Sequence, residues 1–170
     1  MADRARVAAA AVALMLVASA APMAAALSRR AESSSCWEYT RNERRTAERL
    51  NRVRTDHDLG RLRLDPELSR VARSHTKQMV RRKALFHTAT DKLGERVTNW
   101  LLLGENVGAA GDVRRAVKRM MSSDTHAANV LNASYVHIGV GTRRAHDRLW
   151  MTVTFEARRD PGTTLWMPRC

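Results

Sequence analysis

Three polar side chains of this sequence are of types that could support chemistry. His87 follows an apolar Leu-Phe pair, Glu105 lies in a Gly-Glu-Asn-Val run, and His126 begins a His-Ala-Ala-Asn run. Two imidazoles and a carboxylate can hold a divalent cation such as zinc and still leave one position open for water. The same groups could instead form a general acid and base set. We expect each to lie where a helix meets a loop, because side chains at such junctions can converge on a cleft.

Spacing alone does not place these residues in one site. The two histidines lie far apart in the chain, and no His-Glu-x-x-His helix fixes their geometry. His75 lies on the apolar face of a predicted helix, so we interpret it as a buried, hydrogen-bonded core residue. His137 and His146 are expected to be exposed. Asn129 is expected to close the loop after His126 rather than to contact a substrate.

The elements that must position these side chains are four helices followed by two strands. Apolar residues recur at helical spacing in the first two thirds of the mature chain and alternate after that. Helices beside a small antiparallel sheet indicate an α+β layered domain. Met120 and Met121 continue the apolar face of the fourth helix and are expected in the core. The predicted helices cover 38–58, a segment starting at the Asp65-Pro66 cap, 92–103 and a segment capped by Asp112, and the predicted strands cover 136–141 and 149–155.

Residues 1–26 have the layout of a secretory signal peptide. Arg4 and Arg6 form a short positive region, an apolar run follows from Val7 to Ala18, and small residues close the segment. The alternative is an N-terminal anchor that is not cleaved. No other window approaches the about 20 apolar residues of a membrane span. We therefore expect a mature chain without a transmembrane segment that is secreted, extracellular or part of the cell envelope.

Export also bears on the two cysteines, Cys36 and Cys170. In an oxidising compartment two cysteines tend to pair, and a Cys36–Cys170 disulfide would tie the two ends of the mature chain together. The alternatives are two free thiols, or pairing with another molecule. Two cysteines are too few for a dense disulfide scaffold or a four-cysteine zinc module.

The chain is strongly basic. Its 170 residues include 30 Lys and Arg against 17 Asp and Glu, for a net charge of +13. The basic residues are scattered, which is typical of a solvated surface, and the alternative is attraction to anionic polymers or lipid headgroups outside the cell. Aromatic residues make up only 5% of the chain, too few for an extensive base-stacking surface. Export further argues against nucleic acid as the partner.

The order of several short motifs is a more specific signal. Taken together over residues 45–157, they resemble the bacterial branch of the CAP superfamily. These are the SCP-like extracellular domains related to cysteine-rich secretory proteins, the antigen 5 venom allergens and plant pathogenesis-related proteins. The motifs are Leu50-Asn51, Leu62-x-Leu64-Asp65-Pro66, Ala72-x-x-His75, Phe86-His87-Thr88, Gly104-Glu105-Asn106-Val107, His126-x-x-Asn129-Val130, Ile138-Gly139-Val140-Gly141 and Trp150-x-x-x-Thr154-Phe155.

The resemblance implies a three-layer α-β-α sandwich with a three-stranded antiparallel sheet and a long cleft. The family's two cleft histidines fall on His87 and His126, and the glutamate of its Gly-Glu-Asn motif falls on Glu105. In some members the two histidines hold zinc or another divalent cation, so His87 and His126 are the candidate metal ligands. Animal members have a second glutamate near Ser123. Here Asp124 follows, and it would replace that carboxylate only if its loop turned inward; we expect it to cap the turn or face solvent.

With this resemblance the chain divides into four parts. A signal peptide at 1–26 and an N-terminal segment at 27–44 precede the CAP-like domain at 45–157. A C-terminal tail at 158–170 follows, which the Cys36–Cys170 disulfide would hold.

Three classes of function remain open for such a domain. The first, which we favour, is a non-enzymatic extracellular binding module for a lipid, a sterol or an anionic cell-envelope component, with a His/Glu cleft able to hold a divalent cation. The second is a zinc-dependent hydrolase or peptidase in which His87 and His126 hold the metal and Glu105, the candidate catalytic residue, activates water. The third is a structural or host-interaction protein in which these residues only brace loops.

Overall fold

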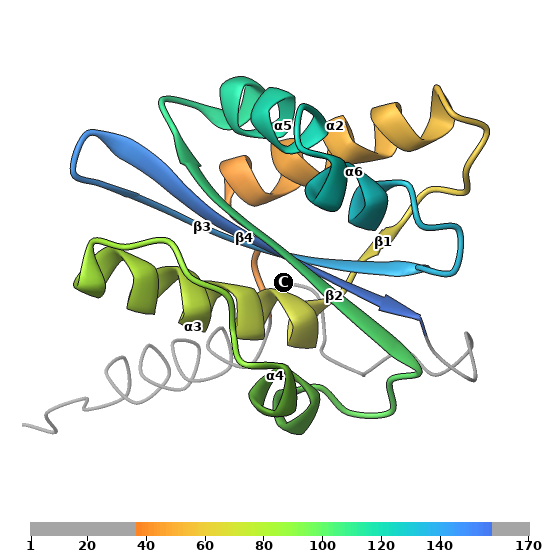
Figure 1. The fold of residues 1–170 in the computed structure, drawn as a ribbon, viewed down its shortest axis with the longest axis horizontal. Helices are drawn as coiled ribbons and strands as arrows, with labels where there is room; N and C mark the ends of the chain where they lie inside the picture. Colours follow the sequence, from red (N-terminus) through yellow and green to blue (C-terminus); the bar gives the residue numbers. More distant parts are fainter. Residues whose placement is uncertain (1–36, 158–170) are drawn as a thin grey trace, which may run out of the picture. The chain divides into compact units, whose positions relative to one another are not determined.

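The computed structural model describes residues 37–157, which fold around a single mixed sheet (Figure 1). The signal peptide predicted at 1–26 lies outside the described residues, as do Cys36 and Cys170 with their predicted pairing. The α+β class predicted from the sequence is confirmed. In chain order the elements are α2 (Arg41–Thr55), β1 (Arg63–Leu64), α3 (Pro66–Arg82), α4 (Thr90–Arg96), β2 (Leu102–Ala110), α5 (Val113–Met121), α6 (Asp124–Val130), β3 (His137–Ala145) and β4 (Arg148–Ala157).

The sheet has four strands in the order β1-β3-β4-β2. Strands β3, β4 and β2 are antiparallel, which confirms both the predicted hairpin and the three-stranded sheet that the family resemblance implies. The short β1, which the sequence pattern does not indicate, adds to β3 in parallel. This order leaves β2 at one edge of the sheet, where Glu105 pairs with Thr154 of β4.

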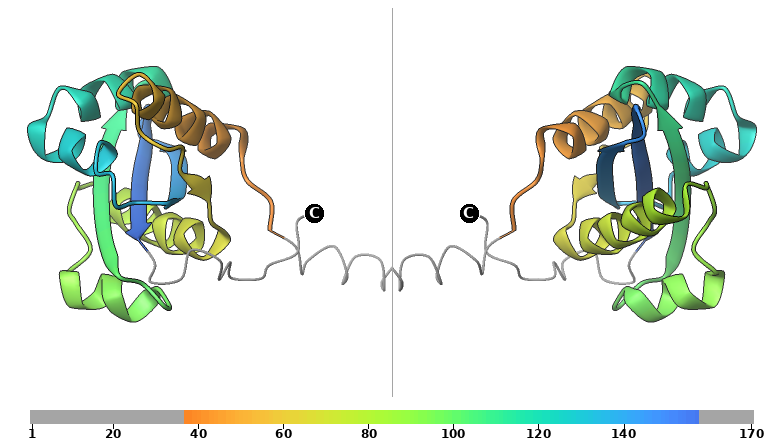
Figure 2. Two further views of the ribbon diagram at one scale, coloured as in Figure 1. Left: turned by 90° about the vertical axis from the view of Figure 1, so that its right-hand side faces the viewer. Right: turned by 90° about the vertical axis from the view of Figure 1, so that its left-hand side faces the viewer.

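Helices cover both faces of the sheet, which confirms the sandwich (Figures 1 and 2). On one face, α2 packs against α5 and β3, and α6 packs against α5 and β2. On the other face, α3 lies across β3 and β4 and packs against α4. The edge strand β2 therefore has one helical layer on each side of it. No helix within residues 37–157 is long and apolar enough to cross a membrane.

Helix α3 approaches β3 closely because β3 presents glycines to it. A Cβ built on Gly139 would lie 2.2 Å from the backbone carbon of Leu68, and one built on Gly141 would lie 2.3 Å from that of Ala72. His137 shares this strand face and is only 1% exposed. The expectation that His137 is exposed is wrong, because the alternation along β3 separates two buried faces rather than a buried face and a solvated one.

The helix caps follow the sequence signals. Helix α2 is shorter than the predicted 38–58, because a reciprocal capping box between Thr40 and Glu43 fixes its start. The predicted caps at Asp65 and Asp112 are confirmed, since each carboxylate accepts a backbone N–H from the first turn of its helix.

The third predicted helix is wrong in its second half. Of the predicted 92–103, the helix α4 ends at Arg96, and the chain becomes strand β2 from Leu102. The Leu-Leu-Gly-Glu-Asn start of β2 shows no clear alternation, so its strand conformation follows from its pairing with β4 over nine residues.

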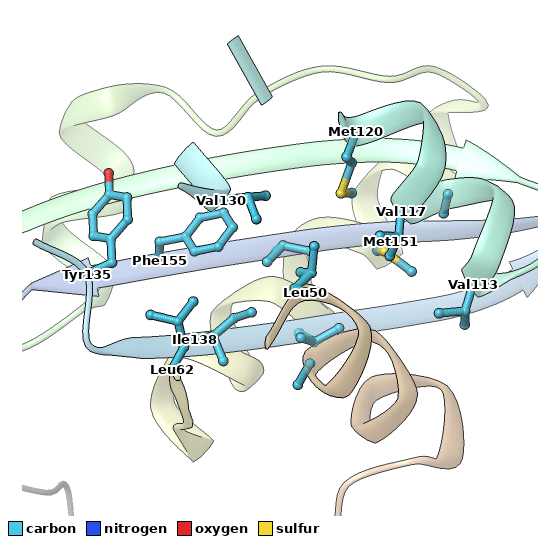
Figure 3. Packing of buried hydrophobic residues seen from close by; sticks show 14 of the residues in the cluster. Leu50, Leu62, Val113, Val117, Met120, Val130, Tyr135, Ile138, Met151 and Phe155 are labelled. Atoms are coloured by element: carbon cyan, nitrogen blue, oxygen red, sulfur yellow. The ribbon is translucent and has the colours of Figure 1, made fainter. Parts of the chain in front are cut away.

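The main core lies between the sheet and the α2–α5 layer (Figure 3). Met120 is 2% exposed and in the core, as predicted, while Met121 packs against it partly buried. Burying one such side chain stabilises the fold by roughly 1.5–3 kcal/mol. This packing anchors α5, and with it the following helix α6, which carries His126. The labelled core residues are Leu50, Leu62, Val113, Val117, Met120, Val130, Tyr135, Ile138, Met151 and Phe155.

Candidate functional site

The site begins with the loop that follows α3. Lys83 takes the left-handed conformation, with φ 52°, and ends the helix. Within α3, the buried His75 donates its Nε2–H to the carbonyl of Phe86 in the following loop over 2.7 Å. The two rings pack edge-on, with centroids 4.9 Å apart. His75 is therefore the buried, hydrogen-bonded histidine that the sequence predicts. It fixes the loop at the residue just before His87.

The carboxylate of Glu105 is held by the residue after His87. The Thr88 backbone N–H donates to Oε1 and its hydroxyl donates to Oε2, each over 2.8 Å. The Glu105 side chain is only 5% exposed, and His75 Nε2 lies 3.9 Å from Oε1. A buried carboxylate is stable only where donors replace its water. Thr88 supplies these donors, so Glu105 has a fixed place and direction in the site.

His87 takes its tautomer from Glu105. Its Nδ1 lies 3.2 Å from Glu105 Oε1, and because a carboxylate only accepts, Nδ1 carries the proton in this contact. In the neutral ring Nε2 then keeps its lone pair. The side chain of His87 is 56% exposed. A carboxylate that orients a histidine in this way is the usual support for a histidine that binds metal.

The second histidine comes from the opposite helical layer, across the sheet edge. Asn106 of β2 donates its side-chain amide to the His126 carbonyl over 2.9 Å. Asn129 of α6 donates to Asn106 Oδ1 over 2.9 Å and to the Glu105 carbonyl over 3.3 Å. Strand β2 is thus tied to α6 by three contacts. These contacts also satisfy one carbonyl of an edge strand, where unpaired groups invite unwanted pairing.

The glycine of the Gly-Glu-Asn run lets α6 and its loop approach β2. A Cβ on Gly104 would lie 2.4 Å from the Tyr135 hydroxyl and 2.9 Å from Asn129 Oδ1. Any larger residue would push these neighbours away from the strand. In this motif Gly104 lets α6 approach β2, the carboxylate of Glu105 orients His87, and the side-chain amide of Asn106 binds the backbone carbonyl of His126.

The two histidines face each other across the edge of β2. Their ring centroids lie 6.4 Å apart, with an angle of 43° between the ring planes. Partial burial lowers the pKa of His126, and the neighbouring His87 lowers it further. Both effects favour the neutral ring of His126, which has a lone pair to offer.

The donors present fit a divalent cation held by two imidazoles. Two rings that share one zinc ion, with Zn–N bonds of about 2.0–2.1 Å, have centroids roughly 5–6 Å apart. The observed centroid distance of 6.4 Å is slightly longer than this. Within residues 37–157 no group of three or more His, Cys, Asp or Glu side chains is arranged to hold a metal. Glu105, whose oxygens accept from Thr88, stands behind His87 rather than beside it as a third ligand.

The structure brings His87, Glu105 and His126 together, but not all on the elements expected. Glu105 lies on a strand and His126 within helix α6, rather than at helix–loop junctions. Asp124 begins α6 and is exposed, as expected. Asn129 does more than close a loop, since it bridges α6 to β2.

Sequence reasoning missed two positioning residues, Thr88 and Asn106. Both sit directly beside a residue that it did select, Thr88 after His87 and Asn106 after Glu105. A threonine or asparagine next to a buried polar group is a common source of its hydrogen bonds. That adjacency is the signal that could have found them.

Comparisons with known proteins bear on the fold and the family. The sequence model of the CAP family, described as the cysteine-rich secretory protein family, matches residues 47–155. No curated protein matches the sequence closely enough to count as a relative.

Several solved structures share the fold. An outer surface protein from Borrelia burgdorferi has 17% identity and a TM-score of 0.65, over 73% of this chain and 98% of that one. An extracellular protein containing an SCP domain from Bacillus anthracis has 27% identity and a TM-score of 0.60, over 69% of this chain. This chain spans only 40% of that protein's length. NaASP2, crystallised with Zn²⁺, has 12% identity and a TM-score of 0.56, over 79% of this chain and 91% of that one.

The family match covers more than half of the chain, and it includes His87, Glu105 and His126. The α-β-α sandwich is consistent with it. This chain belongs to the CAP family.

Proposed function

We propose that this chain is a non-enzymatic extracellular binding module whose His87–His126 pair holds a divalent cation as part of its ligand-binding cleft. The observation that carries the proposal is the contact between His87 Nδ1 and Glu105 at 3.2 Å. It leaves the lone pair of His87 Nε2 available to bind a metal. The ring of His126 lies opposite, at a centroid distance of 6.4 Å. CAP proteins are typically extracellular, and NaASP2, which shares this fold, was crystallised with Zn²⁺.

Binding, rather than hydrolysis, agrees with the surroundings of Glu105. A metal-dependent hydrolase needs a carboxylate that can take a proton from a metal-bound water. Both oxygens of Glu105 accept hydrogen bonds from Thr88, and the side chain is 5% exposed. These contacts suit a residue that orients His87 better than one that exchanges protons with water.

Exposed apolar side chains flank the segments that carry the site and support a lipid or sterol as the ligand. Leu85, two residues before His87, is 51% exposed. Trp100, Leu101 and Leu102 precede Glu105 and are 41–51% exposed. Large apolar residues exposed in neighbouring positions are typical of surfaces that bind partners or membranes.

The test of the cation is zinc retention. Wild-type chain, His87→Ala and His126→Ala would be stripped with chelator, reloaded with zinc, desalted and measured by elemental analysis. We expect close to one zinc per wild-type chain and almost none in either variant. His57→Ala removes an exposed histidine from the turn after α2 and should retain zinc like the wild type. Equal zinc in all four proteins would contradict the proposal.

The lipid part has a separate test. Uptake of labelled sterol and fatty acid by the purified chain should fall when Leu101 and Leu102 are both replaced by Ser. Absence of uptake across the panel by the wild type would remove the lipid and sterol part, and would leave the cation site untouched.

A further inference from the structure

A hollow lies between α2, the start of α5 and the β3–β4 hairpin, and it shares no lining residue with the histidine site. Its volume is about 300 Å³. Its inner wall is apolar, formed by Val113 and Leu149, which are both buried. None of its lining residues takes part in the contacts of His87, Glu105 or His126. The remaining wall is basic and includes the four arginines Arg45, Arg49, Arg114 and Arg144.

The four arginines form a cluster that includes one acid, Asp112. Within residues 37–157, none of the four guanidinium groups pairs with a carboxylate. Arg45 and Arg49 lie one turn apart on α2, where like charges repel and weaken the helix. Arg144 donates one Nη2–H to the Gly111 carbonyl over 3.0 Å, which orients it and leaves other N–H groups unused. Such a cluster of cations attracts anions.

The single acid of the hollow does not neutralise it. Asp112 Oδ1 accepts the backbone N–H of Arg115 over 2.8 Å, and Oδ2 lies 3.7 Å from Arg115 Nε. Its charge is therefore shared between the backbone cap of α5, Arg115, which does not line the hollow, and Arg114, which does. Four cations remain against one acid whose oxygens already have partners.

We propose that this arginine hollow binds a phosphate group. A guanidinium offers a planar fork of N–H donors that matches phosphate oxygens, and several forks around one hollow can share a tetrahedral dianion. The inference deepens the proposed function and rests on it only in expecting an envelope or extracellular source of the phosphate. That source is either a phospholipid headgroup or free phosphate.

The experiment uses two probes and two variants of the full chain. The probes are inorganic phosphate, measured by calorimetry, and co-sedimentation with vesicles of phosphatidylglycerol in phosphatidylcholine against phosphatidylcholine alone. The hollow variant combines Arg45→Gln, Arg49→Gln and Arg114→Gln, because Gln keeps helix propensity. The control variant combines three exposed cations outside the hollow and carries the same charge change: Arg61→Gln, Lys77→Gln and Arg81→Gln.

We expect phosphate affinity to fall at least about tenfold in the hollow variant and to stay within about twofold of wild type in the control. A parallel loss of binding to the anionic vesicles identifies a headgroup as the source. Phosphate binding without vesicle binding identifies free phosphate. The proposal is overturned if the wild type binds neither probe, or if the control loses as much as the hollow variant. Zinc retention measured on the same samples keeps a failure here distinct from a failure of the histidine site.

Discussion

At the scale of single residues, the site depends on a carboxylate that is oriented before any ligand arrives. Glu105 is buried on an edge strand, and its charge is stable there because Thr88 and His87 replace water. The proton on His87 Nδ1 follows from that carboxylate, and so does the lone pair on Nε2. The chemistry of the exposed ring is thus set by a residue that solvent scarcely reaches.

The first prediction concerns the hydroxyl of Thr88. Thr88→Val keeps the shape and the backbone N–H but leaves Glu105 Oε2 without the donor that the structure gives it. We expect the free energy of unfolding to fall by about 1–3 kcal/mol, the typical result of removing one partner of a buried hydrogen bond. Urea unfolding monitored by circular dichroism measures the change.

The matched control is Thr88→Ser, which retains the hydroxyl. It should keep most of the wild-type stability and all of the zinc retention. If the Val and Ser variants unfold at the same urea concentration as the wild type, the hydroxyl does not support Glu105.

The second prediction concerns pH. Burial and His87 lower the pKa of His126 in the folded chain, so the unfolded chain binds its proton more readily. Stability linked to His126 is therefore lost as the pH falls through the unfolded value of about 6.5 towards the lower folded value. We expect wild-type stability to drop between pH 8 and pH 5 more steeply than that of His126→Gln, measured by urea midpoints. Parallel curves would show that His126 titrates alike in both states.

Residue types and motif order predicted the site residues, but they did not predict the burial of His137. His87, Glu105 and His126 could be selected because their motifs keep a recognisable order. His137 could not be placed, because alternation reports that two faces differ and not what covers each. Only the packing of α3 on the glycine face of β3 shows that the second face is also buried.

At the scale of elements, α3 packs closely on β3 because glycines of β3 face the helix. The third prediction follows from this contact. Gly139→Ala would place a Cβ 2.2 Å from the backbone of Leu68, so α3 must shift from the sheet. Overpacking of this kind costs typically about 1–3 kcal/mol, and more where backbone rather than a flexible side chain must move. Thermal unfolding measures the loss.

Gly60→Ala is the control for this change, because a Cβ there has no atom within 4 Å. It should be neutral or slightly stabilising, since alanine restricts the unfolded chain. A Gly139→Ala variant as stable as Gly60→Ala would mean that the α3–β3 contact is looser than the structure shows.

Sequence periodicity did not predict strand β2. The capped helices were predictable because Asp65 and Asp112 signal their starts locally. The β2 segment has a small-residue, mixed pattern, and it becomes a strand by pairing with β4, far along the chain. Glu105 was therefore placed correctly in its motif but on the wrong kind of element.

At the scale of the whole molecule, one buried cation connects distant parts of the chain. Arg54 of α2 is 1% exposed. Its Nε donates to the Gly60 carbonyl, Nη1 donates to those of Val130 and Asn132, all over 2.8 Å, and Nη2 donates to that of Tyr135 over 3.3 Å. The Arg54 side chain thus provides hydrogen-bond donors for backbone carbonyls at the end of α6 and along the segment that leads to β3.

The fourth prediction tests whether this link reaches the site. Arg54→Lys keeps the charge but not the planar fork, and an ammonium group has only three donors for carbonyls that lie in different directions. We expect a loss of about 3 kcal/mol or more in the free energy of unfolding, together with faster hydrogen exchange of the α6 amides. Because α6 carries His126, zinc retention should weaken as well. The control is Arg52→Lys, an exposed position on the same helix, which should leave all three measurements unchanged. Wild-type stability in Arg54→Lys would show that charge alone, without the fork, holds α2 to the segment around α6.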